Sequence, residues 1–250
     1  MPWEKLQAFV LSTLDYGDSD RIVSLFTLEH GRIRAFARGA RKSRKRFGPA
    51  LEPFARIEAQ VRLKEGLSSV QQADIITIYP GIRADLERIA HALYAGELVD
   101  AIAAEGQALP RLFRLHSAYL ERLETEVAAE ADRRFYEINL LNILGYRPSL
   151  ESCARCDSPF GETGALMQND GEPVCRSCSS GGQQIFSATL AMLSSWLRTG
   201  SFGQTAVSRE VLLQAGRMLD GAMGSHLGKR LKSLDFIQQI CIYETSLKMN

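Results

Sequence analysis

Apolar and polar residues alternate with a period of two through much of the first 80 residues. Over residues 53–64 the apolar positions run from Ala55 to Leu63, and charged or amide side chains stand between them. Such alternation is typical of strands that bury one face. Similar short patterns separated by turn residues predict further strands at residues 5–14, 21–27, 32–38 and 67–76. Five short strands predict an OB-type β-barrel, and an SH3-like barrel would fit the same strand count.

The period changes to that of a helix after Pro80 and Gly81. Residues 135–144 are apolar nearly all round and predict a central, buried helix. Apolar stripes predict the other helices, at residues 86–102, 112–127, 187–199, 208–227 and 233–247. The fold class is therefore α+β, with a barrel over residues 1–80 and a helical domain. We expect residues 81–148 and 185–250 to form that helical domain.

The stretch from Arg32 to Pro49 concentrates positive charge. On the strand at residues 32–38, the alternation sets an aromatic ring among arginines on the outer face. The loop that follows packs five more cations into six residues, and a polyanion would relieve their mutual repulsion. We expect this surface to bind nucleic acid, rather than to serve only as a solvated loop. Its candidate residues are Arg32, Arg34, Phe36, Arg38, Arg41, Lys42, Arg44, Lys45 and Arg46.

Composition and charge indicate the class of protein and its cellular compartment. The 250 residues are 45% hydrophobic and 24% charged, as in ordinary globular proteins, and the net charge is +1. Basic residues outnumber acidic ones by 13 to 9 over residues 1–80, whereas acidic residues dominate over 81–150. No apolar run approaches the roughly 18 residues of a membrane span, and the first residues resemble no secretory signal. We expect a cytoplasmic protein that binds a polyanion through residues 1–80.

Two C-x-x-C pairs predict a metal site. Cys153 and Cys156 form the first pair and Cys175 and Cys178 the second, with 18 residues between the pairs. Thiolates at this spacing can close a tetrahedron around one Zn²⁺, and the intervening turn residues are typical of a zinc ribbon over residues 149–184. Two disulfides are the structural alternative, which a reducing cytosol disfavours. Because four thiolates leave no position for substrate, we expect one structural zinc ion.

Several segments together resemble a known family. Residues 16–21, 30–32 and 37–41 look like the N-terminal signature of RecO, the bacterial recombination mediator. Residues 135–153 resemble the family's segment that leads into its zinc site, and residues 231–233 resemble its C-terminal signature. The resemblance covers nearly the whole chain in matching order.

The resemblance implies a DNA-repair mediator with no active site and no small-molecule substrate. Such a protein binds single- and double-stranded DNA, anneals complementary strands, and works with RecR to load RecA. It also engages the C-terminal tail of single-stranded DNA-binding protein. On this sequence, local charge and the C-terminal signature place that acidic tail near Lys229, Arg230 and Lys232. A bacterial cytoplasmic protein associated with the nucleoid is implied.

Three other functions fit parts of the pattern. An OB barrel with a zinc ribbon also suits an RNA-binding protein. A zinc-dependent nuclease would need clustered carboxylates, whereas Asp15, Asp18 and Asp20 look like turn residues. In a pure adaptor, the basic loop would hold an acidic protein tail.

Overall fold

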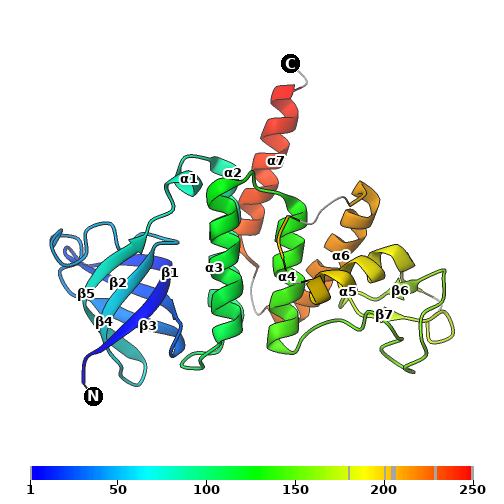
Figure 1. The fold of residues 1–250 in the computed structure, drawn as a ribbon, viewed down its shortest axis with the longest axis horizontal. Coiled ribbons are helices and arrows are strands. Elements are labelled where there is room, and N and C mark those ends of the chain that lie inside the picture. The colour runs from blue at the N-terminus through cyan, green and yellow to red at the C-terminus, as the bar shows by residue number, and fades with distance from the viewer. Residues whose placement is uncertain (1, 180, 200, 204–206, 228–229, 249–250) are drawn as a thin grey trace. The chain divides into compact units, whose positions relative to one another are not determined.

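The computed structural model describes residues 2–179, 181–199, 201–203, 207–227 and 230–248, with side chains up to residue 240 (Figure 1). The chain forms two compact units. One comprises residues 1–128 and 229–250, and the other comprises residues 129–228. None of the described helices is both long and apolar enough to cross a membrane.

A closed five-stranded barrel forms the N-terminal part of the first unit. Its strands are β1 (Glu4–Tyr16), β2 (Asp20–Thr27), β3 (Gly31–Ala37), β4 (Arg56–Arg62) and β5 (Leu67–Thr77). They are ordered β1-β2-β3-β5-β4 around the barrel, β3 and β5 run parallel, and β4 pairs again with β1. The predicted OB-type barrel is confirmed, although β1 extends two residues beyond its expected end.

Strict alternation fills the barrel interior. On β3, Ile33, Ala35 and Ala37 point inward and are almost fully buried, and the inward residues of β4 are equally buried. The loop between β3 and β4 also contributes apolar side chains, because Phe47 and Leu51 belong to the same buried cluster. The basic loop is therefore anchored in the barrel core.

The described part of the first unit also contains four helices. They are α1 (Pro80–Arg83), α2 (Leu86–Ile102), α3 (Pro110–Thr125) and α7 (Lys232–Lys248). The outer face of the barrel packs on α3 through aromatic contacts, in which Phe9 and Phe26 meet Phe113 and His116. Burial lowers the pKa of His116 to about 3, so this ring is neutral near pH 7.

In its described residues, the second unit combines three helices with a small sheet. Its helices are α4 (Glu130–Leu144), α5 (Ser187–Thr199) and α6 (Arg209–His226), and its strands are β6 (Ala165–Met167), β7 (Pro173–Val174) and β8 (Gln183–Ile185). As predicted, α4 is buried along most of its length. Its buried residues include Arg133, Arg134 and Glu137, so charged as well as apolar side chains are buried along this helix.

The two compact units cut across the predicted division of the chain. The boundary expected near residue 80 lies inside the first unit, because α2 packs against β1 and β2 as well as against α7. The predicted helical domain thus contributes to both units, and the division by sequence segment stays a prediction.

Candidate nucleic-acid interface and metal centre

The basic surface spans the outer face of β3 and the loop that follows it. Arg34 and Arg38 are exposed on β3 and just after it, and Phe36 is half-buried between them. All five loop cations are exposed. Among the described residues, the cations of this surface that form no ion pair are Arg34, Arg38, Lys42, Arg44, Lys45 and Arg46. We call these six residues the free cation cluster.

Local hydrogen bonds fix the start of the loop. The Asp20 carboxylate accepts a 2.7 Å hydrogen bond from the backbone N–H of Gly39, which adopts a positive φ of 68°. This hydrogen bond is the main reason why the pKa of Asp20 is lowered, and the Ser19 hydroxyl and the nearby Arg38 and Lys42 add to it. Asp20 therefore holds the end of β3 and the first loop residues in place.

The rest of the loop folds back onto the barrel. The Arg46 guanidinium donates to the Arg38 carbonyl at 2.9 Å and to the Ser43 hydroxyl at 3.1 Å. The next residue, Phe47, is only 3% exposed, and the Arg46 carbonyl accepts a hydrogen bond from the Ala73 N–H of β5. Cations on an anchored loop lose less conformational freedom when they bind a ligand than cations on a free loop do.

Arg32 departs from the expected arrangement. Its guanidinium donates to the Ala103 carbonyl at 3.1 Å and lies 3.6 Å from a carboxylate oxygen of Asp100 and 3.5 Å from one of Glu105. The side chain is only 15% exposed. The alternation places Arg32 correctly on the outer face, but helix α2 and the residues after it cover this end of the strand. The Arg32 guanidinium therefore already has hydrogen-bond and ion-pair partners within the first unit.

Arg41 occupies an intermediate position. It lies 3.4 Å from the Asp15 carboxylate and donates to the Gly17 carbonyl, while its side chain stays 41% exposed. Its charge is partly offset, in contrast to the free cation cluster.

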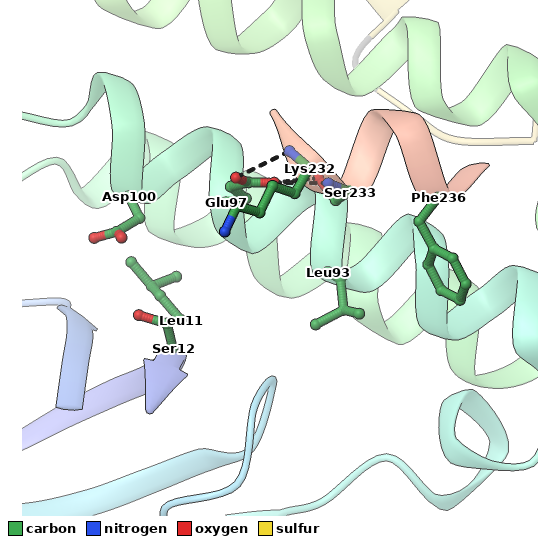
Figure 2. Close-up of a pocket in the computed structure, with 8 residues that line it drawn as sticks. All are labelled: Leu11, Ser12, Leu93, Glu97, Asp100, Lys232, Ser233 and Phe236. Carbon is green, nitrogen blue, oxygen red and sulfur yellow. Dashed lines mark hydrogen bonds between the residues drawn. The ribbon is translucent and has the colours of Figure 1, made fainter. Parts of the chain in front are cut away.

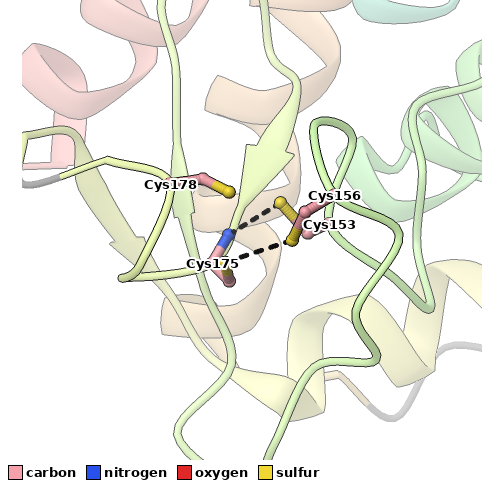
Figure 3. A group of neighbouring side chains, drawn as sticks. All are labelled: Cys153, Cys156, Cys175 and Cys178. Carbon is pink, nitrogen blue, oxygen red and sulfur yellow. Dashed lines mark hydrogen bonds between the residues drawn. The ribbon is translucent and has the colours of Figure 1, made fainter.

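The four predicted cysteines come together in the second unit (Figure 3). Their sulfur atoms all lie within 4.8 Å of one another, and the Sγ atoms of Cys156 and Cys175 are 3.7 Å apart. A tetrahedron with metal–sulfur distances of about 2.3 Å has sulfur–sulfur edges of about 3.8 Å, so the donor set fits one tetrahedral ion. The four residues can therefore hold a metal.

The surroundings of the thiols favour thiolates at one end of the site. Burial opposes ionisation of Cys153, but N–H groups of Cys175 and Arg155 donate to its sulfur and lower its pKa to about 6. The neighbouring sulfurs of Cys156 and Cys175 raise the pKa of Cys178 to about 12. Four adjacent thiolates repel one another, and a bound cation would remove that repulsion.

The described residues around the cysteines form a small buried cluster. It consists of Cys153, Leu166 and Val174. The turn at Gly171 rests directly on α6, where a Cβ at Gly171 would lie 2.3 Å from the Met218 carbonyl oxygen. Glycine is required at this close approach, and the backbone φ of 79° also favours it.

The family comparisons match this architecture segment by segment. The family model described as Recombination protein O N terminal matches residues 1–79, which contain the barrel. The model described as Recombination protein O C terminal matches residues 83–235, which contain the four cysteines. The chain belongs to the RecO family.

Individual relatives agree with this assignment. A DNA repair protein RecO from Pelobacter propionicus is 63% identical over 95% of this chain and 97% of its own length. Proteins of the same name from Geobacter sulfurreducens and Myxococcus xanthus are 49% and 37% identical, over 94% and 93% of this chain and 98% and 96% of their own lengths.

The C-terminal signature that suggested RecO has a structural role at the start of α7. The Glu97 carboxylate of α2 accepts hydrogen bonds from the backbone N–H groups of Lys232 and Ser233 and a 2.6 Å bond from the Ser233 hydroxyl (Figure 2). A carboxylate at this position satisfies the unpaired N–H groups of a helix N-terminus and complements its dipole. The signature thus fastens α7 to α2.

A cavity of about 520 Å³ adjoins this contact. Its two carboxylates have partners within the first unit, because Asp100 accepts a 2.6 Å hydrogen bond from the Ser24 hydroxyl and Glu97 caps α7. The residues that line it are Leu11, Ser12, Leu93, Glu97, Asp100, Lys232, Ser233 and Phe236.

The predicted partner-binding residues of this chain differ in their surroundings. Arg230 is exposed but pairs with the Asp235 carboxylate. Lys232 has an exposed side chain beside the cavity. Lys229 lies outside the described residues.

Sequence reasoning missed two contributors to the basic surface. The sequence places Asp20 in a turn and both Asp20 and Tyr16 in the RecO-like signature, but not in the basic surface. In the structure, Asp20 fixes Gly39, and Tyr16 ends β1 with its ring 5.9 Å from that of Phe36. The alternation of β1 would have placed Tyr16 on the outer face, had the strand been continued past Leu14.

Proposed function

We propose that this chain is a recombination mediator that binds single- and double-stranded DNA through the free cation cluster and anneals complementary strands. With RecR, it would help to load RecA onto DNA coated by single-stranded DNA-binding protein. The supporting observation is that six cations on one anchored barrel surface form no ion pair within the described chain, in a protein of the RecO family.

The proposed activity needs no covalent chemistry. Two complementary strands repel each other through their phosphates, and a cationic surface that screens both strands lowers the barrier to pairing. Because phosphate contacts carry no base information, we expect little sequence preference.

The same proposal assigns zinc to the four cysteines as a structural ion. Bound zinc would cross-link the two C-x-x-C loops, and the thiolates leave no open position for a substrate. We assign the acidic tail of single-stranded DNA-binding protein to the surface near the start of α7. Of the three cations predicted there, Lys232 has an exposed side chain and forms no ion pair in the described chain.

Strand annealing tests the proposal most completely. Complementary labelled oligonucleotides are mixed with the wild-type chain, with and without a coat of single-stranded DNA-binding protein and with and without RecR. The loop variant replaces Arg41, Lys42, Arg44, Lys45 and Arg46 with glutamine. We expect the wild type to accelerate annealing and the loop variant to lose most of that acceleration.

A control variant removes charge elsewhere on the barrel. Lys5→Gln with Lys64→Gln alters two exposed cations outside the basic surface, and we expect this variant to anneal like the wild type. Equal annealing by the loop variant and the wild type would contradict the DNA site. Tighter binding to RNA than to a DNA strand of the same sequence would favour the RNA-binding alternative.

A further inference from the structure

An apolar row crosses the outer face of the barrel beside the free cation cluster. In register, Leu14 of β1 lies opposite Ile22 of β2, and Ile22 lies opposite Phe36 of β3. Directly opposed residues project from the same face of a sheet. Tyr16, two residues beyond Leu14, projects from this face as well and reaches across to Phe36. We call these four residues the apolar strip.

The strip is accessible to solvent. Leu14 is 65% exposed and Tyr16 is 57% exposed, while Ile22 and Phe36 are half-buried. Single exposed apolar residues are common on protein surfaces, but neighbouring ones on adjacent strands indicate a binding surface. The rings of Tyr16 and Phe36 meet edge to face, with an interplanar angle of 81°. This contact orients the Tyr16 ring and leaves much of its surface open.

The charges around the strip identify the class of ligand. Arg34 and Arg38 are exposed and flank Phe36 along β3, and the basic loop begins three residues after Arg38. A ligand that covers both features must carry flat apolar groups next to regularly spaced negative charges. An unpaired nucleic-acid strand has this composition, since its bases offer π-faces and its backbone offers phosphates. In a duplex the same faces are already stacked inside the helix.

We propose that the apolar strip, with Tyr16 as its most exposed ring, stacks unpaired bases while the free cation cluster holds the backbone. This inference rests on the proposed function and adds to it a source of preference for single strands. The cations contact phosphates, which single strands and duplexes both carry. The strip, in contrast, contacts a base only when that base is unpaired. Tyr16 is then a binding residue that acts on base faces, independently of the phosphates.

An oligonucleotide without bases separates the two contributions. The probes are a labelled oligothymidylate of about 12 nucleotides, within the usual range of OB site sizes, and an abasic strand of the same length. Both carry the same phosphates, and affinities are measured by fluorescence anisotropy at one salt concentration. We expect the wild type to bind the thymidylate more tightly than the abasic strand.

Substitution of Tyr16 should reduce that preference. Tyr16→Ala is expected to weaken thymidylate binding roughly 5- to 150-fold, the range for loss of one base–aromatic stack. It should leave abasic binding, duplex binding and the salt dependence unchanged. Tyr16→Phe keeps the ring and should behave like the wild type. Trp3→Ala, which removes a partly exposed ring at the opposite end of β1, is the matched control and should also have no effect.

The outcome is scored as a ratio of two affinities, so it does not depend on the success of the charge variants. Equal affinity of the wild type for the thymidylate and abasic strands would overturn the inference. Equal weakening of both strands by Tyr16→Ala would overturn it too. If the loop variant still loses affinity for both strands in either case, the proposed function stands without the strip. If the loop variant binds both strands like the wild type, the proposed function fails instead.

Discussion

The arginines of the basic surface and those of α4 have the same side chain in opposite surroundings. Arg34 and Arg38 stand exposed beside a loop of further cations, and neither forms an ion pair in the described chain. Arg133 and Arg134 are 7% and 6% exposed, and both bind the fully buried Glu137 carboxylate. Burial opposes the charge of Arg134, but Glu137 and Asp220 outweigh this effect and raise its pKa. A guanidinium is available to a polyanion only where the chain supplies no carboxylate of its own.

The same contrast extends to the thiols. In the second unit, Glu137 neutralises buried charge at α4, and the four cysteines could hold a cation that neutralises their thiolates. The first unit instead leaves its six-cation cluster open, and anchors the loop that carries four of these cations through Phe47 and Leu51 in the barrel core. Changes in the second unit should therefore affect stability, and changes in the free cation cluster should affect binding.

If the four cysteines hold zinc as proposed, its removal should have the largest effect on stability. Structural zinc typically contributes an apparent 10–16 kcal/mol, and the buried cluster around the cysteines is small. We expect a chelator, or Cys153→Ser with Cys175→Ser, to unfold the segment from residue 149 to residue 184. Metal content and hydrogen exchange of that segment measure this, with re-added zinc as the control for the chelated protein. Unchanged exchange after complete metal removal would contradict the structural role.

Substitution of Glu137 should have the next largest effect. Glu137→Ala removes a fully buried carboxylate from two buried guanidiniums and leaves them the partly exposed Glu130 and Asp220. We expect this loss to lower the free energy of unfolding of the second unit by about 3–5 kcal/mol. Glu130→Ala is the matched control, since Glu130 contacts the same arginines but is 43% exposed. It should cost about 0–1 kcal/mol. Equal losses from the two variants in chemical denaturation would contradict the importance of burial.

Two substitutions on β3 compare an arginine that has partners within the chain with one that is exposed and forms no ion pair in the described chain. Arg32→Gln removes a hydrogen bond to the Ala103 carbonyl and should destabilise the first unit by about 1–3 kcal/mol without changing DNA affinity. Arg34→Gln should do the reverse, weakening DNA binding with a stability change within about 0.5 kcal/mol. Thermal unfolding and anisotropy titrations on the same samples measure both. An equal loss of DNA affinity in Arg32→Gln and Arg34→Gln would contradict the proposed difference between the two arginines.

Local patterns predicted the barrel and the cysteine cluster, because both depend on short-range spacing. Alternation along 32–38 and 53–64 determines which side chains fill the barrel, and a C-x-x-C pair brings two sulfurs together within one turn. The partners of Arg32 lie beyond residue 99, so no local pattern identifies them. Helix α7 packs on α2 in the first unit, with a hydrogen bond between Glu97 and Ser233, which are even more remote in the sequence.

The salt dependence of single-strand binding tests the central claim most directly. If about six cations contact phosphates, the slope of log affinity against log salt should be about −4 for the wild type. The five-glutamine loop variant retains Arg34 and Arg38 from the free cation cluster, so its slope should fall to about −1.4. An unchanged slope in that variant, with unchanged affinity at low salt, would contradict the account.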